Sequence, residues 1–332
     1  MRLRAALVTP LSGSLAGYGR AGLVALRLWA ERAGADVLTY DTEPDPVAAT
    51  RAALATRPDL VFGPYGSGPA RAVIAAAAGR LVFNHGGSAI DGQDSLAVSV
   101  LAPADTGWHG AVRRSADAGL RSVHVAHGDS GFGRAVGGGA YAEAQRLGLA
   151  ATRGDLSATD PPAAELLLTA GRFEDEQAAA AALLPGRWRL AGLCGAGVDE
   201  VLAALGAARE GLLGPAQWTA ATAPDPTLGP TAAEFVSAYR AAAGSDPPYP
   251  AAQAFAAGLI AERCLADAGG TGDEAMFAAA RALDVVTLFG RFRIDGTGRQ
   301  VGHQILTVQW QDGVRRVIWP PEQAEAALRV GG

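Results

Sequence analysis

Residues 60–92 read LVFGPYGSGPARAVIAAAAGRLVFNHGGSAIDG, and this stretch decides the fold. Two short apolar runs, Leu60–Gly63 and Leu81–Asn84, lack the polar alternation of a half-exposed strand, which is typical of parallel strands buried on both faces. The alanine-rich run between them, Pro69–Ala78, favours a helix. The order of strand, helix and strand predicts two neighbouring strands of a parallel α/β sheet.

Each of these two strands is followed by a loop of small and polar residues. Parallel strands end at the same edge of a sheet, which is where open α/β sheets bind ligands. Glycines would let a ligand approach backbone N–H groups, and two serines add hydroxyls, which suits a carboxylate or amide oxygen. Helix capping is the alternative role for the serines. The candidate residues are Tyr65, Gly66, Ser67, His85, Gly86, Gly87 and Ser88.

Length and composition favour two lobes and argue against several function classes. The chain has 332 residues, which is long for a single core. Its 28 basic and 33 acidic residues give a net charge of −5 without a basic patch, so no nucleic-acid partner is expected. No apolar run reaches the length of a membrane span. Cys194 and Cys264 lack a CxxC spacing and are interpreted as two buried free thiols, with one disulfide as the alternative.

The strand–helix alternation begins at Arg4–Thr9 and begins again at Arg121. Gly17-Tyr-Gly-Arg-Ala-Gly22 and Gly131-Phe-Gly-Arg-Ala-Val136 each open the first helix of a half, which indicates a structural repeat. The predicted fold class is α/β, with two doubly wound parallel-sheet lobes. In the second half we expect helices at 162–170, 174–184 and 198–209, and the proline-rich segment 246–250 is a candidate crossover between the lobes.

Enzyme motifs are incomplete, so neither an enzyme nor a cofactor nor a metal is expected. Gly17-x-Gly19-x-x-Gly22 with Asp41 matches a dinucleotide fingerprint, but seven residues, Pro10–Ala16, separate it from the preceding strand. His85-Gly86-Gly87 resembles an esterase oxyanion loop, but no Gly-x-Ser-x-Gly elbow accompanies it. The five histidines lack metal-ligand spacing, and the acids of Glu174–Glu176 are interpreted as solvated at a helix start.

Several segments, in order along the chain, resemble the branched-chain amino acid binding proteins of ABC transporters, which are type I periplasmic binding proteins. The opening Thr9-Pro-Leu-Ser-Gly-Ser-Leu-Ala-Gly-Tyr-Gly19 is similar, and so are the loops with Ser67 and Gly86-Gly87-Ser88. Further resemblances are Asp129-Ser-Gly-Phe-Gly133, Glu234-Phe-x-x-x-Tyr239, Tyr249-x-Ala-Ala-Gln-Ala-Phe255, Phe289-Gly-Arg-Phe-Arg-Ile-Asp295 and Gln309-Trp-Gln-Asp-Gly313.

The resemblance implies two lobes joined by three crossovers, with a ligand held in a cleft that closes by hinge motion. Lobe one would be 1–120 plus 248–303, and lobe two 121–247 plus 304–332. It also implies that Ser67, Ser88 and the backbone of Gly86 bind the ligand carboxylate. Tyr18 on lobe one and Phe132 on lobe two match aromatic positions around the ligand.

One departure from the family pattern concerns the ligand's amine. Amino-acid binders of this family place an acid on the second lobe, but the corresponding Gly214-Pro-Ala-Gln-Trp-Thr219 has none. A desolvated ammonium without a counter-charge is costly, and Trp218 with Phe132 suggests an apolar or aromatic ligand body, to which His85 could add a polar contact. We therefore expect an amino-acid-like ligand or, more specifically, a carboxylate or amide without a free amine.

The expected function is that of the solute-binding protein of an ABC importer, whose partners are a small-molecule ligand and a membrane permease. The alternatives are a cytosolic ligand sensor on the same fold, similar to amide-sensing regulators, and an NAD-dependent enzyme. Met1-Arg-Leu-Arg4 leads directly into the first strand without a signal peptide. The expected location is therefore extracytoplasmic (periplasmic, or lipid-anchored at the cell surface) if a signal has been removed, and cytoplasmic otherwise.

Overall fold

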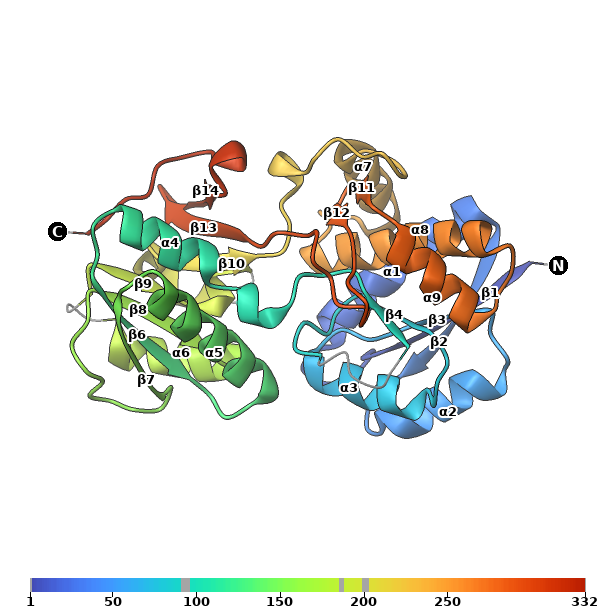
Figure 1. Ribbon diagram of the computed structural model, residues 1–332, viewed down its shortest axis with the longest axis horizontal. Helices are drawn as coiled ribbons and strands as arrows, with labels where there is room; N and C mark the ends of the chain where they lie inside the picture. The colour runs from blue at the N-terminus through green and yellow to red at the C-terminus, as the bar shows by residue number, and fades with distance from the viewer. Residues whose placement is uncertain (1, 91–95, 185–187, 199–202, 332) are drawn as a thin grey trace. The chain divides into compact units, whose positions relative to one another are not determined.

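The chain divides into two compact units, each built from segments that are far apart in the sequence (Figure 1). The computed structural model describes residues 2–90, 96–184, 188–198 and 203–331. Unit 1 comprises Met1–Pro103 and Trp218–Gln304, and unit 2 comprises Ala104–Gln217 and Ile305–Gly332. The chain therefore passes from one unit to the other three times, after residues 103, 217 and 304.

Unit 1 is built around a five-stranded parallel sheet with strand order β2-β1-β3-β4-β5. Its first segment contains β1 (Leu3–Thr9), α1 (Ala16–Ala33), β2 (Ala35–Asp41), α2 (Pro46–Ala55), β3 (Leu60–Phe62), α3 (Ser67–Ala76), β4 (Val82–Asn84) and β5 (Ala97–Ser99). Its second segment contains η4 (Ala220–Thr222), α7 (Ala232–Ala243), α8 (Tyr249–Ala268), α9 (Asp273–Ala282), and the pair β11 (Val285–Thr287) and β12 (Gly290–Phe292).

This sheet is doubly wound, with helices packed on both faces. Successive residues of a strand point to opposite faces, so each strand contributes to both packing layers. Leu7 of β1 and Phe62 of β3 belong to the large cluster that contains residues of α1, α8 and α9. Val8 of β1 packs instead with residues of α2 and α3, and Val61 of β3 packs against α3 and the strands beside it. Both faces are thus covered, which explains the uninterrupted apolar runs in the sequence.

Local signals in the sequence set the ends of several helices. The Asp45 carboxylate accepts hydrogen bonds from the N–H groups of Val47 (2.9 Å) and Ala48 (3.1 Å), so it caps α2. Helix α1 ends at Gly34, whose φ of 65° lies in the left-handed region. In unit 2, the Ser130 hydroxyl accepts from Gly133 N–H at 2.9 Å and fixes the start of α5 (Gly131–Arg146) directly after a strand.

Unit 2 contains a seven-stranded sheet with strand order β14-β13-β10-β9-β8-β6-β7. Its elements are η1 (Ala104–Thr106), α4 (His109–Asp117), β6 (Ser122–His127), α5, β7 (Ala150–Asp155), β8 (Leu166–Ala170), α6 (Phe173–Leu183), β9 (Leu190–Gly192), η2 (Cys194–Gly197), η3 (Ala203–Arg209), β10 (Leu213–Ala216), β13 (Leu306–Gln311), β14 (Val314–Trp319) and η5 (Pro321–Gln323). Strands β13 and β14 are antiparallel, and the other strand pairs in this sheet, apart from β10–β13, are parallel. The fold class expected from the sequence is confirmed.

Two expected lobe boundaries need correction. Residues 104–120 lie in unit 2 because α4 packs against β10, β13 and β14. Residues 218–247 lie in unit 1 because α7 contacts α1, and because the ring of Phe235 in α7 packs against that of Phe255 in α8 with centroids 4.9 Å apart. The proline-rich segment 246–250 therefore joins two helices of the same unit, and the expectation that it crosses between lobes is wrong.

The secondary structure expected in the second half also needs correction. The prediction of a helix at 162–170 is wrong, because Leu166–Ala170 form strand β8, which pairs with β6 inside the sheet. Strand β7 was not expected at all, since its exposed sequence AATRGD lacks a strand pattern. The predicted helix at 198–209 includes residues 199–202, which lie outside the described residues, and its last part is η3, a 3-10 turn kinked at Gly206.

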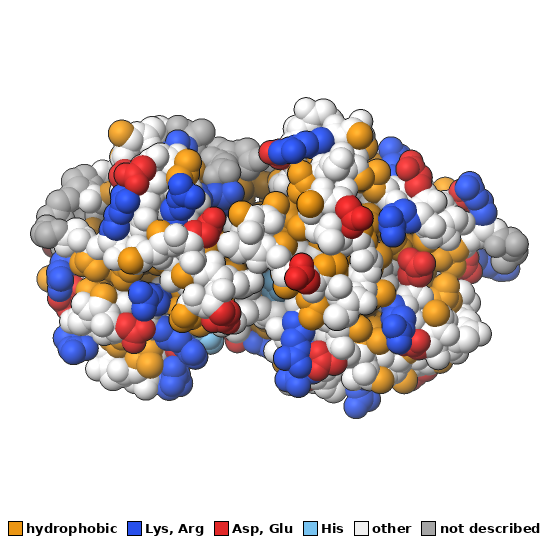
Figure 2. Space-filling view, turned by 90° about the horizontal axis from the view of Figure 1, so that it is seen from above, with side chains coloured by type: hydrophobic (Ala, Val, Ile, Leu, Met, Phe, Trp, Pro, Cys, Tyr) orange, Lys and Arg blue, Asp and Glu red, His pale blue; other side chains and the backbone are white. Residues whose placement is uncertain are grey.

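On the face of the molecule shown in Figure 2, acidic and basic side chains are interspersed rather than gathered by sign. Among the residues that the structure describes, no helix has both the length and the apolar character needed to cross a bilayer.

Candidate functional site

The two loops singled out in the sequence lie side by side in unit 1, at the carboxyl ends of neighbouring strands β3 and β4. Tyr65 and Gly86 form a parallel bridge beyond the strands. Gly66 N–H donates to the Gly86 carbonyl at 3.0 Å, and Gly63 N–H donates to the Phe83 carbonyl at 2.9 Å. The loops therefore continue the sheet pairing, and we call residues 65–67 together with 86–88 the strand-end site.

The glycines of this site are needed mainly for the contact between the loops. A Cβ on Gly86 would lie 2.4 Å from Tyr65 Cα, and a Cβ on Gly87 would lie 2.4 Å from Ala70 Cβ. Gly87 N–H donates to Asn84 Oδ1 at 2.9 Å, and Asn84 Nδ2 donates back to the Gly87 carbonyl at 2.7 Å. The expectation that these glycines leave their N–H groups open to a ligand is corrected by these internal bonds.

The two serines differ in what holds them. Ser67 is the first residue of α3, and its hydroxyl oxygen accepts from Ala89 N–H at 3.0 Å, so it joins the two loops while its own proton stays available to a ligand. It does not cap the helix, because Gly66 occupies the cap position without a side-chain bond. Ser88 is half-buried in the second loop. The N–H groups of Ser67 and Gly68 open α3 and have no acceptor within the helix, so the site combines hydroxyl and amide donors.

Three tyrosines gather beside these loops. The rings of Tyr18 and Tyr65 stack with centroids 4.6 Å apart. The hydroxyl of Tyr65 is hydrogen-bonded to the hydroxyl of Tyr249, which opens helix α8. The sequence predicts Tyr18 and Tyr65 as site residues, but it places Tyr249 in a hinge segment. The two prolines before Tyr249 mark a helix start, and this is the signal in the sequence that could have placed Tyr249 at the edge of a site.

The structure buries the His85 side chain against α1, and the polar ligand contact expected for it stays a prediction. Its side chain is fully buried, and neither ring nitrogen has a hydrogen-bond partner among the described residues. The ring lies against Gly22 of α1, where an added Cβ would be 3.3 Å from it. Burial lowers the pKa of His85 to about 4, so the ring is neutral at physiological pH.

The two predicted aromatic contacts of the second lobe belong to different units. Phe132 lies half-buried near the start of α5 in unit 2, and its role in ligand binding stays a prediction. Trp218 lies in unit 1, where its ring packs on Phe235 and its Nε1–H donates to the Leu288 carbonyl at 2.9 Å. Trp218 is therefore a core residue, and its assignment to the second lobe is wrong.

Unit 2 holds a buried carboxylate at the carboxyl edge of its sheet. Glu176 of α6 is fully buried and accepts from Thr169 Oγ1 (2.6 Å), Cys194 N–H (2.9 Å) and Gly195 N–H (2.8 Å). Burial raises its pKa to about 7, against the three donors, which lower it. The interpretation that this acid is solvated is wrong, because it anchors the turn after β9.

Neither a metal centre nor a disulfide is present in the described part of the chain. No group of three or more His, Cys, Asp or Glu side chains there could hold a metal ion. Cys194 and Cys264 are both free and buried, and the expectation of two buried thiols is confirmed. The chemistry available at the strand-end site is hydrogen bonding to a ligand oxygen beside an aromatic wall.

Comparison with known proteins identifies the fold. Residues 175–314 match the family model described as periplasmic binding protein. A leucine-binding protein from Thermotoga maritima superposes with a TM-score of 0.78 at 16% identity, over 95% of this chain and 97% of that one. The chain has the type I periplasmic binding protein fold. This confirms the resemblance seen in the sequence.

Two further solved structures with this fold are complexes. An ABC transporter solute-binding protein from R. palustris with bound 4-hydroxybenzoate has a TM-score of 0.76 at 16% identity, over 96% of this chain and 95% of that one. A branched-chain amino acid binding protein from Streptococcus pneumoniae with isoleucine has a TM-score of 0.75 at 16% identity, over 96% and 100%. No curated protein sequence matches the chain.

Proposed function

We propose that this chain is the solute-binding protein of an ABC importer and that it binds a small carboxylate or amide at the strand-end site. The observation that supports the proposal is that Ser67 and Ser88 lie in the two loops that the Tyr65–Gly86 bridge joins, beside the stacked Tyr18 and Tyr65. Two hydroxyls and the open amides of a helix start can hold both oxygens of a carboxylate. In this role the protein would work outside the cytoplasm and deliver its ligand to a membrane permease.

The ligands of proteins with this fold support the carboxylate. Isoleucine and 4-hydroxybenzoate, bound by the Streptococcus pneumoniae and R. palustris proteins, share a carboxylate and differ in the amine. In the present chain the residues after β10, from Gln217 to Thr219, include no acid to pair with an ammonium. We therefore propose a ligand without a free amine, covered by closure of the second unit, with Phe132 contributing an aromatic contact.

A thermal-shift screen of the ligand-stripped protein tests the ligand class. The panel pairs isoleucine with its deaminated acid, and benzoate and 4-hydroxybenzoate with benzamide. A ligand at 100 times its Kd stabilises a protein by about 2.7 kcal/mol, which such a screen detects. We expect shifts with the acids or the amide and none with isoleucine. A shift with isoleucine alone would contradict the absence of an amine partner.

Serine variants test the site itself. Ser67→Ala and Ser88→Ala each remove a hydroxyl donor, which should weaken binding of the ligand found by the screen by ~1–3 kcal/mol if its acceptor is charged. Ser245→Ala, at an exposed position of unit 1, is the matched control and should bind as the parent does. Unchanged affinity in both site variants would refute the assignment of the strand-end site.

A further inference from the structure

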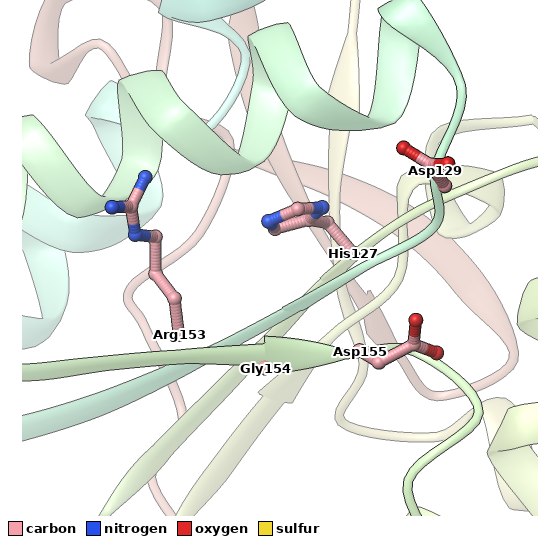
Figure 3. A pocket seen from close by; sticks show the side chains of 5 residues that line it. All are labelled: His127, Asp129, Arg153, Gly154 and Asp155. Atoms are coloured by element: carbon pink, nitrogen blue, oxygen red, sulfur yellow. The ribbon is translucent and has the colours of Figure 1, made fainter.

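A pocket of about 260 Å³ lies in unit 2 at the carboxyl ends of β6 and β7 (Figure 3). It is lined by His127, Asp129, Arg153, Gly154 and Asp155. Every lining residue comes from unit 2, and none belongs to the strand-end site of unit 1. The pocket thus gathers cationic, anionic and imidazole side chains that the proposed transport function does not use.

The register of two parallel strands brings these side chains together. His127 of β6 is paired with Asp155 of β7, and Arg153 precedes Asp155 by two residues, so the three side chains share one face of the sheet. Figure 3 shows the His127 ring between Arg153 on one side and Asp155 and Asp129 on the other. The floor of the pocket therefore runs from a cation to a carboxylate across the His127 ring.

Helix α5 forms a wall and leaves the pocket open. Arg134 is ion-paired with Asp129. The Arg153 guanidinium lies over the ring of Tyr141, with its Cζ 4.4 Å from the ring centroid. Gly138 is four residues after Arg134 and three before Tyr141, which places it on the same side of the helix. A Cβ at Gly138 would meet no atom within 4 Å. A larger side chain at this position would extend into that open space.

The charges that remain unpaired in the pocket are one of each sign. Among the described residues, no carboxylate forms an ion pair with Arg153, whereas Asp129 is neutralised by Arg134. Asp155 Oδ1 accepts from Ser157 N–H (2.7 Å) and Ser157 Oγ (2.5 Å), and its second oxygen bonds to none of the described residues. His127 Nδ1 faces the Gly128 carbonyl at 3.3 Å, which leaves Nε2 for a ligand.

We propose that this pocket binds a small zwitterion, with its carboxylate on Arg153 and its ammonium on Asp155. A simple anion or a simple cation would leave one of the two pocket charges without a partner, whereas a zwitterion satisfies both. Side chains two residues apart on a strand start about 6.6 Å from each other, a separation that a molecule with both charges on a short carbon chain can span. All its lining residues belong to unit 2, and its ligand differs from the one proposed for the strand-end site of unit 1, which carries no amine.

Imidazole NMR of the full chain tests the proposal, with β-alanine as the probe and propionate and propylamine as its single-charge analogues. The chain has five histidines, and His127→Gln identifies the His127 ring signals. We expect β-alanine to move these signals in a saturable way, and the two analogues to need at least tenfold higher concentrations. No movement with β-alanine, or an equal response to propionate, would overturn the proposal.

Variants then localise the response. Gly138→Leu adds a branched side chain on the face of α5 that carries Arg134 and Tyr141, without removing a charge, and should weaken the β-alanine response at least tenfold. Ala178→Leu places a leucine at an exposed position of α6 and should not weaken it. Arg153→Gln tests the carboxylate end by the same readout, should Gly138→Leu fail to fold. Ser88→Ala should leave the response unchanged. A response lost in Ser88→Ala and kept in Gly138→Leu would place the probe at the strand-end site and refute this one.

Discussion

The five parallel strands of each sheet follow the same order, but their carboxyl edges carry different chemistry. In unit 1 the loops after β3 and β4 present hydroxyls, glycines and tyrosines, and they are joined by backbone pairing. In unit 2 the edge carries a buried carboxylate, Glu176, and the charged pocket around His127. The fold thus fixes where each edge lies, while a few residues per loop decide whether it offers neutral donors or charges.

The comparison also shows two ways of holding a strand-end loop in place. Gly86 and Gly87 let backbone approach backbone closely in unit 1, where hydrogen bonds between uncharged groups join the loops. In unit 2 the Glu176 carboxyl group of α6 accepts from two N–H groups of the turn after β9, so a titratable side chain holds that turn. The first arrangement should respond to added volume, and the second should respond to pH.

The largest expected effect comes from adding volume in unit 1. Gly86→Val places side-chain atoms against Tyr65 Cα and the Pro64 carbonyl, which an added Cβ would approach to 2.4 and 2.7 Å. We expect the free energy of unfolding to fall by ~4 kcal/mol in urea titrations, because backbone atoms must move apart. Gly68→Val is the matched control, since a Cβ there meets no atom within 4 Å, and it should stay within about 0.5 kcal/mol of the parent.

The next largest effect is the pH dependence of stability that the buried Glu176 in unit 2 should cause. The pKa of Glu176 is raised from 4.5 to about 7 by burial, so between these values the folded protein keeps a proton that the unfolded chain has released. The free energy of unfolding should therefore fall as pH rises through this window, by about 3 kcal/mol in total. Glu176→Gln should flatten this dependence in urea titrations at pH 4.5 to 7.5. An unchanged slope in the variant would mean that Glu176 does not titrate there.

How far the sequence predicts this architecture differs between the two units. In unit 1 the paired loops follow from apolar runs broken by glycine and serine, because both signals are local. In unit 2 the sequence does not show that Glu176 is buried, since its partners Cys194 and Gly195 come from a turn 18 and 19 residues away. Strand β8 reads as a helix because leucine and alanine favour one, and only its pairing with β6 decides otherwise.

Aromatic residues divide in the same way. Tyr18 and Tyr65 are recognisable because each lies in a glycine-rich segment after a strand, Tyr18 in the first turn of α1 and Tyr65 in the loop after β3. The position of Trp218 depends instead on where the chain returns to unit 1. No local signal marks that return. His85 is a similar case, because its loop position is evident from the sequence but its burial depends on Gly22 of α1, 63 residues earlier.

A smaller effect distinguishes core from site among these aromatics. Trp218→Phe removes the Nε1–H bond to the Leu288 carbonyl and should lower the free energy of unfolding by about 1–2 kcal/mol, with ligand affinity unchanged. Phe132→Ala should do the reverse, weakening ligand binding more than stability, because its ring is half-buried near the start of α5. Calorimetric binding and urea titration of both variants separate the two effects. A loss of ligand affinity in Trp218→Phe would instead show that Trp218 takes part in ligand binding.

The smallest effect concerns the hydroxyl pair beside the strand-end site. Tyr65→Phe and Tyr249→Phe each remove one partner of the bond between α8 and the first loop, and each should cost about 1 kcal/mol of stability. The double variant should cost little more than either single one, because the same bond is lost only once. Additive costs in urea titrations would show that the hydroxyls act independently. Coupling, by contrast, would show that the hydroxyl bond joins α8 to the loop that carries Tyr65.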